Sequence, residues 1–339
     1  MSENPISPKH SPWPNRLAVA LALATFPLIW VGGLVTTTDA GMAVPDWPGT
    51  YGYNLFLYPW QTWLFGPWDL FIEHGHRLLG AAVGMITIGL VAVVWIYDSR
   101  RWLRYAALGA LALVIFQGVL GGVRVLLDER LVAMIHGCVA PLFFAYAASL
   151  VVFTSQSWRD APDRPLDPAG QRLARAAWIL AGVAYVQLVL GAILRHPLPD
   201  APSLFRGAVL LHVVVAFVLL AQTLLFHISA LRSGCLAGRG VRWASLFTMI
   251  LVVGQLALGG ATWIAKYAWP AWLESFQFAA AYVIEEKSIA QSLIVTAHVA
   301  NGALILAVLV MQAWSLSRRF FRLADAACAL ETHLVRAAA

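Results

Sequence analysis

Four of the nine histidines recur in equivalent positions of a repeated sequence unit, which makes them the first candidates for chemistry. His76, His136, His212 and His298 each lie near the start of a long apolar segment. A single histidine in such a segment can be an ordinary packing residue, although ionisable groups inside apolar helices usually have a function. Four histidines at one position of the repeat therefore indicate a common role.

Paired imidazoles on facing helices are typical ligands of a low-spin haem iron. Zinc would instead require three or four ligands in one tetrahedron, and no cysteine or carboxylate cluster accompanies these histidines in the sequence. The sequence therefore predicts two haem sites, formed by His76 with His136 and by His212 with His298. A proton or ion path through the same histidines is the alternative, because transporters are also built from repeats.

One carboxylate distinguishes the first of these sites from the second. Glu73 precedes His76 by three residues and lies on the same helix face. The equivalent positions before the other histidines hold Ala133, Val209 and Val295. This asymmetry predicts one reactive haem site and one electron-transfer site. The alternative is that Glu73 only favours the helix N-terminus or pairs with Arg77 four residues later.

Five arginines near the histidines are candidate partners for the propionate groups of a haem. Guanidinium matches the geometry of a carboxylate through two parallel hydrogen bonds. The five residues are Arg77, Arg124, Arg130, Arg195 and Arg206. The alternative is that they are ordinary anchors at the membrane interface.

The composition shows which elements must position these residues. Of 339 residues, 60% are hydrophobic and 12% are charged, with a mean hydropathy of +0.73, whereas soluble domains have roughly 45–50% apolar and about 25% charged residues. This excludes an ordinary water-soluble enzyme. Eight apolar runs reach the roughly 20 residues that a bilayer requires, namely 16–36, 73–97, 103–126, 131–154, 172–194, 207–231, 240–264 and 293–316.

A short motif late in the odd-numbered spans indicates that the repeated unit is a two-helix hairpin, used four times. Small residues in this motif allow a backbone or a flat ligand to approach closely. The motif comprises Gln117, Leu120, Gly121 and Gly122, then Gln187, Leu190, Gly191 and Ala192, then Gln255, Leu258, Gly259 and Gly260, while the first span keeps Gly32 and Gly33. We expect an all-α integral membrane protein of eight transmembrane helices, arranged as two four-helix bundles related by a pseudo-twofold axis.

The distribution of basic residues predicts how the chain lies in the membrane. Sixteen of the 23 Lys and Arg residues fall in the tails and in the loops after the second, fourth and sixth spans, and the positive-inside rule places this side in the cytoplasm. Nucleic-acid binding is then unnecessary to explain the net charge of +6. We expect cytoplasmic segments at 1–15, 155–171 and 317–339, with one bundle at 16–154 and the other at 172–316.

Two long loops on the opposite side, residues 37–72 and 265–292, are rich in aromatic residues. Trp and Tyr prefer the membrane interface, so an aromatic belt is one interpretation. A lid folded over a bound hydrophobic ligand is the other. Because these loops contain no cysteine, we expect no structural disulfide in them.

Several segments resemble the haem A synthase family. These are GGLVTTTDAGMAVPDWPGTYG after the first span, EHGHRLLG at the start of the second, HGCVAPLFF in the fourth and AHVANGALI in the eighth. The resemblance extends over residues 16–316, and EHGHR fits the family pattern ExxHR. Some members carry cysteine pairs in the outer loops, so this chain is similar to the cysteine-lacking branch.

The resemblance implies oxidation of the C8 methyl group of haem O to a formyl group, which gives haem A for cytochrome oxidase assembly at the inner cell membrane. It implies that Glu73 is catalytic, that His76 and His136 bind the substrate haem in the bundle at 16–154, and that His212 and His298 bind a permanent haem b at 172–316. Haem O and its synthase are then expected partners. The sequence leaves two questions open. One is whether the protein forms a homo-oligomer, and the other is whether quinol or ferredoxin donates its electrons.

Two other functions fit the four histidines. A dihaem b-type cytochrome that passes electrons between quinol and a partner would need all four histidines but would not need Glu73. A haem or ion transporter is the third hypothesis. The carboxylate at position 73 favours the oxidoreductase.

Overall fold

Long apolar helices dominate the computed structural model, which describes residues 11–160, 168–196, 202–267 and 288–337. Eight of these helices are long and apolar enough to cross a membrane. Inside a bilayer the main-chain N–H and C=O groups have no water to bond, so each spanning segment must satisfy them within a helix. The eight predicted spans are confirmed, and the protein is a multi-pass membrane protein.

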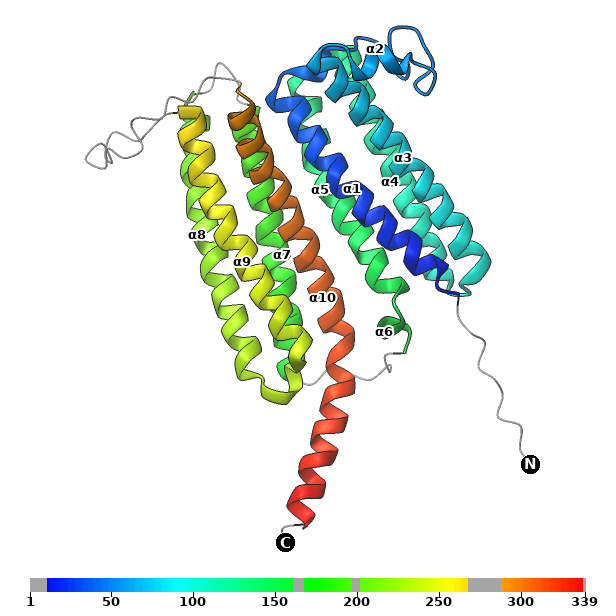
Figure 1. Ribbon diagram of the computed structural model, residues 1–339. Coiled ribbons are helices and arrows are strands. Elements are labelled where there is room, and N and C mark those ends of the chain that lie inside the picture. The colour runs from blue at the N-terminus through cyan, green and yellow to red at the C-terminus, as the bar shows by residue number, and fades with distance from the viewer. Residues whose placement is uncertain (1–10, 161–167, 197–201, 268–287, 338–339) are drawn as a thin grey trace.

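The spanning helices begin and end within a few residues of the predicted runs, with one exception. They are α1 (Trp13–Thr37), α3 (Trp68–Tyr97), α4 (Arg101–Leu127), α5 (Arg130–Thr154), α7 (Pro168–Arg195), α8 (Pro202–Arg232), α9 (Gly234–Tyr267) and α10 (Ile289–Ala337). The connections contain η1 (Ala40–Met42), α2 (Trp60–Leu64) and α6 (Gln156–Arg159). The exception is α10, which continues far beyond the predicted end of its span and projects from the bundle in Figure 1.

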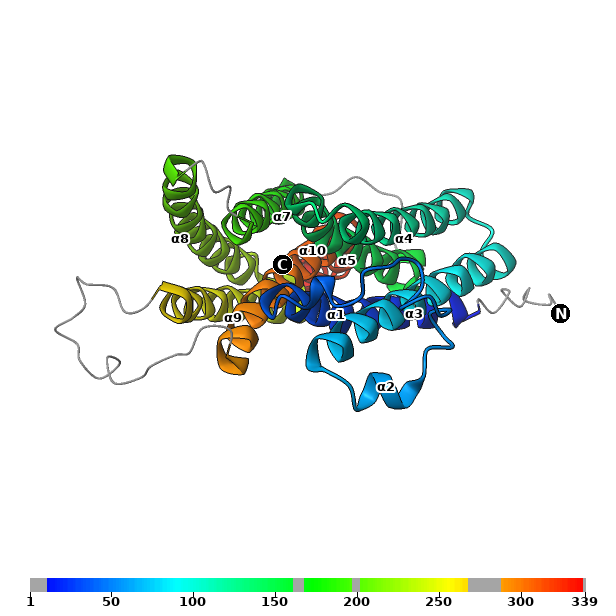
Figure 2. The same cartoon turned by 90° about the horizontal axis from the view of Figure 1, so that it is seen from above.

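The spanning helices form two groups of four, which we call the first half (α1, α3, α4, α5) and the second half (α7, α8, α9, α10). In the first half α1 and α4 each pack against α3 and α5, and in the second half α7 and α9 each pack against α8 and α10. Seen from above in Figure 2, the halves lie side by side, and α10 packs against α1 and α5 at the seam. The pseudo-twofold relation between the halves stays a prediction.

Each half has its own apolar core, and a cluster of small residues joins the two. Leucines fill both cores, namely Leu21, Leu90, Leu103 and Leu150 in the first half and Leu180, Leu306, Leu309 and Leu316 in the second. At the seam, Phe144 and Ala148 of α5 belong to one cluster with Ala300, Ala303 and Ala307 of α10. Small side chains at this position allow the two helices to approach closely inside the bilayer.

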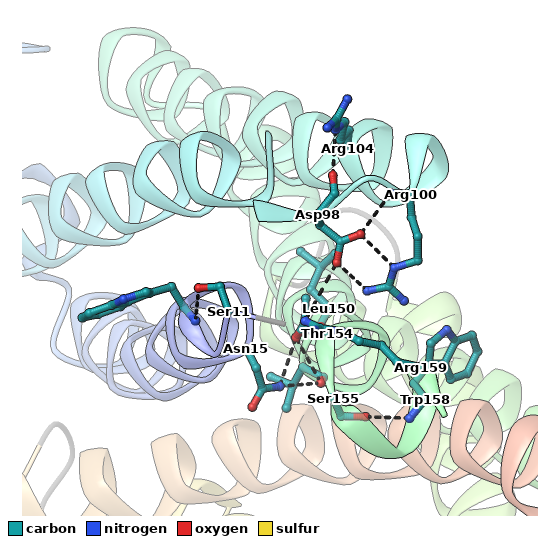
Figure 3. A network of polar contacts seen from close by, with 12 residues as sticks. Ser11, Asn15, Asp98, Arg100, Arg104, Leu150, Thr154, Ser155, Trp158 and Arg159 are labelled. Carbon is teal, nitrogen blue, oxygen red and sulfur yellow. Dashed lines mark hydrogen bonds and ion pairs between the residues drawn. The ribbon is translucent and has the colours of Figure 1, made fainter. Parts of the chain in front are cut away.

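A polar network fixes the connections at the end of the first half that the basic residues predict to be cytoplasmic (Figure 3). The carboxylate of Asp98, between α3 and α4, accepts hydrogen bonds from Nε and Nη2 of Arg100 at 2.9 and 2.8 Å. Arg159 of α6 forms a longer ion pair with Asp98 at 3.9 Å. Burial alone would raise the pKa of Asp98, but the hydrogen bonds and charge of Arg100 lower it below its usual value. The network thereby joins the connection between α3 and α4 to α6.

Candidate functional site

Each of the four histidines lies against a glycine of the preceding long helix. A Cβ atom on these glycines would stand between 2.8 and 3.4 Å from Cε1 of the imidazole, so a side chain there would crowd the ring. The pairs are Gly32 with His76, Gly121 with His136, Gly191 with His212 and Gly259 with His298. The first small residue of each motif therefore makes room for the histidine of the same hairpin. The fourfold repeat predicted from the sequence is confirmed in space.

In three of the four hairpins, the glutamine of the motif forms a hydrogen bond to the helix that carries the histidine. Its Nε2 donates a hydrogen bond to the main-chain carbonyl of the histidine residue itself. The pairs are Gln117 with His136 at 3.3 Å, Gln187 with His212 at 2.8 Å and Gln255 with His298 at 2.9 Å. The equivalent position in α1 is Leu28, so His76 lacks this support. In these three hairpins the glutamine thus holds the first helix in register with the second.

The histidines of the second half face each other across the bundle. The ring centroids of His212 and His298 lie 6.3 Å apart, with 69° between the ring planes. Bonds of about 2.0–2.1 Å from a metal to each imidazole nitrogen would put the two nitrogens about 4 Å apart. The centroids would lie somewhat further apart, so the observed separation is compatible with a metal between the rings. In the first half, His76 and His136 are also close enough to interact electrostatically.

The donor set fits a haem iron better than a tetrahedral metal. Each of the four imidazoles interacts with a main-chain carbonyl of the preceding long helix, at Leu28, Gln117, Gln187 and Gln255 respectively. A histidine that binds a metal through one ring nitrogen commonly donates its other N–H to such a carbonyl. Within the described ranges, no three His, Cys, Asp or Glu side chains come together as they would around zinc. Two imidazoles per site match the axial ligation of a haem.

The carboxylate of Glu73 is buried beside the first site, with only 3% of the residue exposed. Its Oε1 pairs with Nη2 of Arg77 at 2.8 Å, and its Oε2 accepts a hydrogen bond from the main-chain N–H of Val44 at 2.9 Å. Arg77 also donates to the main-chain carbonyls of Val44, Asp46 and Gly49. The alternative contact weighed from the sequence, an ion pair with Arg77, is therefore present. Through these contacts Glu73 also positions the segment between α1 and α3, residues 38–67, which we call the outer loop. The catalytic role of Glu73 stays a prediction.

His74 and Trp47 also hold the outer loop against the helices of the first half. His74 is buried, its Nδ1 lies 2.9 Å from Oγ1 of Thr50, and its ring packs against Tyr58 and Trp63. The indole of Trp47 lies over the second glycine of the α4 motif, where a Cβ atom would stand 2.3 Å from the ring. Sequence reasoning left His74 unassigned and did not predict either contact. Both depend on residues far apart in the chain.

A tight turn completes this loop. The carboxylate of Asp46 accepts hydrogen bonds from the main-chain N–H groups of Tyr51 and Gly52 at 2.7 and 2.9 Å. Burial would raise the pKa of Asp46, but these hydrogen bonds and the charge of Arg77 lower it below its usual value. Further along, Phe65 is 81% exposed. Trp47, Tyr51 and Tyr53 near the turn are also exposed, and the lid and the aromatic belt both stay predictions. The aromatic residues at 269–282 lie outside the described residues.

The five candidate arginines occupy different environments. The guanidinium of Arg124 lies against Gly41, where a Cβ atom would overlap it, and it is close enough to His76 and His136 to act on both electrostatically. Nη2 of Arg195 donates to the main-chain carbonyl of Gly33 at 2.7 Å. Arg77 is occupied with Glu73 and the outer loop, as described above. The remaining two, Arg130 and Arg206, are exposed.

Two residues near Arg195 were missed by sequence reasoning as parts of this group. Lys266 interacts electrostatically with Arg195, and His196 with Arg195, Arg124 and Lys266. Burial and these neighbouring cations lower the pKa of His196 to about 4. A signal for Lys266 existed in the sequence, because α4, α7 and α9 each have a basic residue in the last turn.

Comparison with known proteins finds a family model that matches part of the chain. Residues 67–198 match the model of a family described as cytochrome oxidase assembly protein. This range includes Glu73, His76 and His136 and ends before His212.

Curated relatives extend the match beyond that range. The chain is 28% identical over 268 residues to a protein named Heme A synthase from Shouchella clausii, covering 72% of this chain and 85% of the relative. It is 32% identical over 187 residues to a protein of the same name from Symbiobacterium thermophilum, covering 53% and 58% of the two chains. A third, from Hyphomonas neptunium, is 25% identical over 235 residues, covering 57% of this chain and 62% of the relative. The chain, with its eight spans and its repeated glycine and histidine pairs, is thus similar in sequence to several proteins named Heme A synthase.

Proposed function

We propose that the protein is a haem A synthase of the cell membrane, which oxidises the C8 methyl group of haem O to a formyl group. The observation that supports this most directly is the difference between two otherwise similar histidine pairs in a chain that is similar to proteins named Heme A synthase. Only the first pair has a buried carboxylate on its helix, three residues before a histidine. The product, haem A, would serve cytochrome oxidase assembly.

In this proposal the first half binds the substrate. His76 and His136 would hold the iron of haem O, with Gly32 and Gly121 keeping both imidazoles in place. The loop around Asp46 and Trp47 would cover the outer end of the site and exclude water, because it is fastened to α3 through Glu73, Arg77 and His74. Conversion of the methyl to the formyl group removes four electrons from one carbon, through two hydroxylations and loss of water, and the oxidant would be a small molecule from outside the chain.

Glu73 would act on protons at the carbon that is oxidised. A positioned carboxylate that accepts a proton typically contributes about 10²–10⁴-fold to a rate. The ion pair with Arg77 and the hydrogen bond from Val44 fix the position of this carboxylate. The same contacts would connect the state of Glu73 to the outer loop, since Arg77 binds three carbonyls of that loop.

The second half would hold the permanent cofactor. His212 and His298 fit a haem b iron by their separation and by the main-chain carbonyls of Gln187 and Gln255 beside their rings. A bound haem b would pass single electrons to or from the first half. Quinol and ferredoxin are the candidate electron donors. We place both termini in the cytoplasm, because the basic residues gather at the end of the molecule away from the histidines.

The decisive experiment is coexpression with a haem O synthase, followed by chromatographic identification of the haems extracted from the purified protein. We expect haem b together with haem O or haem A from the wild type, and haem b with haem O but little haem A from Glu73→Gln. Haem b alone, with rapid reduction by quinol, would instead identify an electron-carrying dihaem cytochrome. A haem O synthase that copurifies would support the expected partnership.

A further inference from the structure

The side chain of Arg195 crosses from the second half to the first. Arg195 lies in the last turn of α7, one helical turn beyond Gly191, which contacts His212. Its Nη2 donates a hydrogen bond to the carbonyl of Gly33 in α1. Gly33 follows the glycine that contacts His76. One cation of the second half therefore ends beside α1, the helix of the first half whose Gly32 contacts His76.

Close packing at the seam makes this crossing possible. A Cβ atom on Gly33 would stand only 2.8 Å from Cγ2 of Thr296 in α10, so the absence of a side chain allows α1 and α10 to touch there. Oγ1 of Thr296 also lies 3.2 Å from Oγ1 of Thr37. The outer ends of the halves are thus in contact at the level of the histidines.

Positive charge accumulates at the same place. Arg195 interacts electrostatically with Arg124 of the first half and with Lys266 of α9. The carboxylate of Glu73 is already paired with Arg77. Like charges brought together near a membrane interior are unfavourable unless an anion joins them. Glu73 and Asp128 act as opposite charges on Arg124, and Asp39 does so on Lys266. The charge that acts on Arg195 is the like charge of Arg124, so an anion beside Arg195 would be favourable.

The two arginines also have hydrogen-bond donors to spare. A guanidinium has five N–H donors. Within the described part of the chain, Arg195 uses one position, towards Gly33, and Arg124 makes no hydrogen bond. Arg124 is the cation that acts electrostatically on both His76 and His136. Free donors in this position point to a carboxylate that belongs to a molecule bound at those histidines.

We propose that Arg195, although it belongs to the second half, is a positioning residue of the substrate site in the first half, where it binds a propionate of haem O together with Arg124. This inference rests on the proposed function of the first site. It also separates these two arginines from the other three candidates. Guanidinium binds carboxylate through paired, charge-assisted hydrogen bonds, so neutralising the carboxylate should remove the effect of the arginine.

The test compares haem O with its dimethyl ester, in which both propionates are uncharged. Full-length protein that contains haem b alone is titrated with each compound, and the absorbance change of the added haem gives the two dissociation constants. The wild type should bind haem O about tenfold more tightly than the ester. In Arg195→Gln the affinity for haem O should fall about tenfold, with the affinity for the ester unchanged, and Arg195→Lys should recover part of the loss.

Haem b content and a matched substitution serve as controls. Arg232→Gln removes the same charge from an exposed position at the opposite end of the second half and should change neither constant. An equal loss for both compounds in Arg195→Gln would show that Arg195 only joins α7 to α1, which overturns the proposal. Loss of haem b with unchanged haem O affinity would assign Arg195 to the second half and overturn it as well.

The same titration separates this inference from the proposed function. If the wild type binds haem O as described but produces no haem A on coexpression, the proposed function fails and the role of Arg195 stands. If Arg195→Gln retains the wild-type preference for haem O over its dimethyl ester, the role of Arg195 fails and the proposed function stands. If the wild type binds neither compound at His76 and His136, both are overturned.

Discussion

In both halves of the molecule a histidine lies on a glycine of the preceding helix, but what surrounds that histidine differs between the halves. Around His76 there are a buried carboxylate, an arginine bound to the outer loop and an indole packed on α4. The residue three positions before His212 and before His298 is a valine, and the main-chain carbonyls of both histidines accept hydrogen bonds from Gln187 and Gln255. The hairpin therefore supplies ligand geometry, and the groups that could do chemistry are additions to one half.

The largest effect should come from removing a ligand in the second half. His212→Ala or His298→Ala should each abolish bound haem b, because a six-coordinate low-spin iron needs both imidazoles. The measurement is the reduced-minus-oxidised spectrum of purified protein, with His227→Ala as a control histidine of the same half. Normal haem b content in either ligand variant would remove the distinction between a cofactor half and a substrate half.

Glu73→Gln should lower the rate of haem A formation by about 10²–10⁴-fold, because the amide keeps the shape of the carboxylate but cannot accept the proton. Haem b and bound haem O should stay at wild-type levels, as measured by extraction and chromatography. Haem A formation at the wild-type rate would show that the carboxylate is not what distinguishes the first half. Loss of folding and of haem b would show that it only fastens the outer loop through Arg77.

The glycines offer a smaller and local perturbation of each site. Gly259→Ala places a methyl group 3.2 Å from Cε1 of His298, so we expect a few-fold loss of haem b affinity and unchanged haem O binding. Gly260→Ala is the matched control, because nothing lies within 4 Å of the added atom. Gly32→Ala should affect only the first half. Equal effects of Gly259→Ala and Gly260→Ala on haem b would contradict the contact with His298.

The smallest expected effect is a loss of stability at low pH in the turn that Asp46 holds. The pKa of Asp46 is lower in the folded protein than its ordinary value of 3.8, so ionised Asp46 stabilises the turn above that pH and the contribution is lost as the pH falls below it. Amide hydrogen exchange at Tyr51 and Gly52, corrected for its intrinsic pH dependence, should therefore rise on acidification below about pH 4. Asp46→Asn should remove this dependence. Unchanged protection in the wild type would mean that Asp46 does not hold the turn.

The sequence predicts those features that the bilayer or the repeat imposes. The spans follow from length and apolarity, because only a helix satisfies the main chain in lipid, and the fourfold use of the hairpin follows from the repeated motif. The contact of Gly121 with His136 was not predicted. Contacts such as His74 with Thr50 and Arg195 with Gly33 depend on which distant segments meet, and no local pattern specifies that. The length of α10 was also missed, because beyond the membrane a helix is no longer required by the solvent.

The pairing of each glycine with the histidine of its own hairpin has a consequence for how the protein is made. Spans enter the membrane in the order in which they are synthesised, and α4 with α5, or α7 with α8, are consecutive in the chain. His136 can therefore take its place on Gly121 as soon as its own helix has been inserted, without waiting for the rest of the polypeptide. Insertion in chain order would then orient each histidine against the preceding long helix, and the half-sites would form before haem binds.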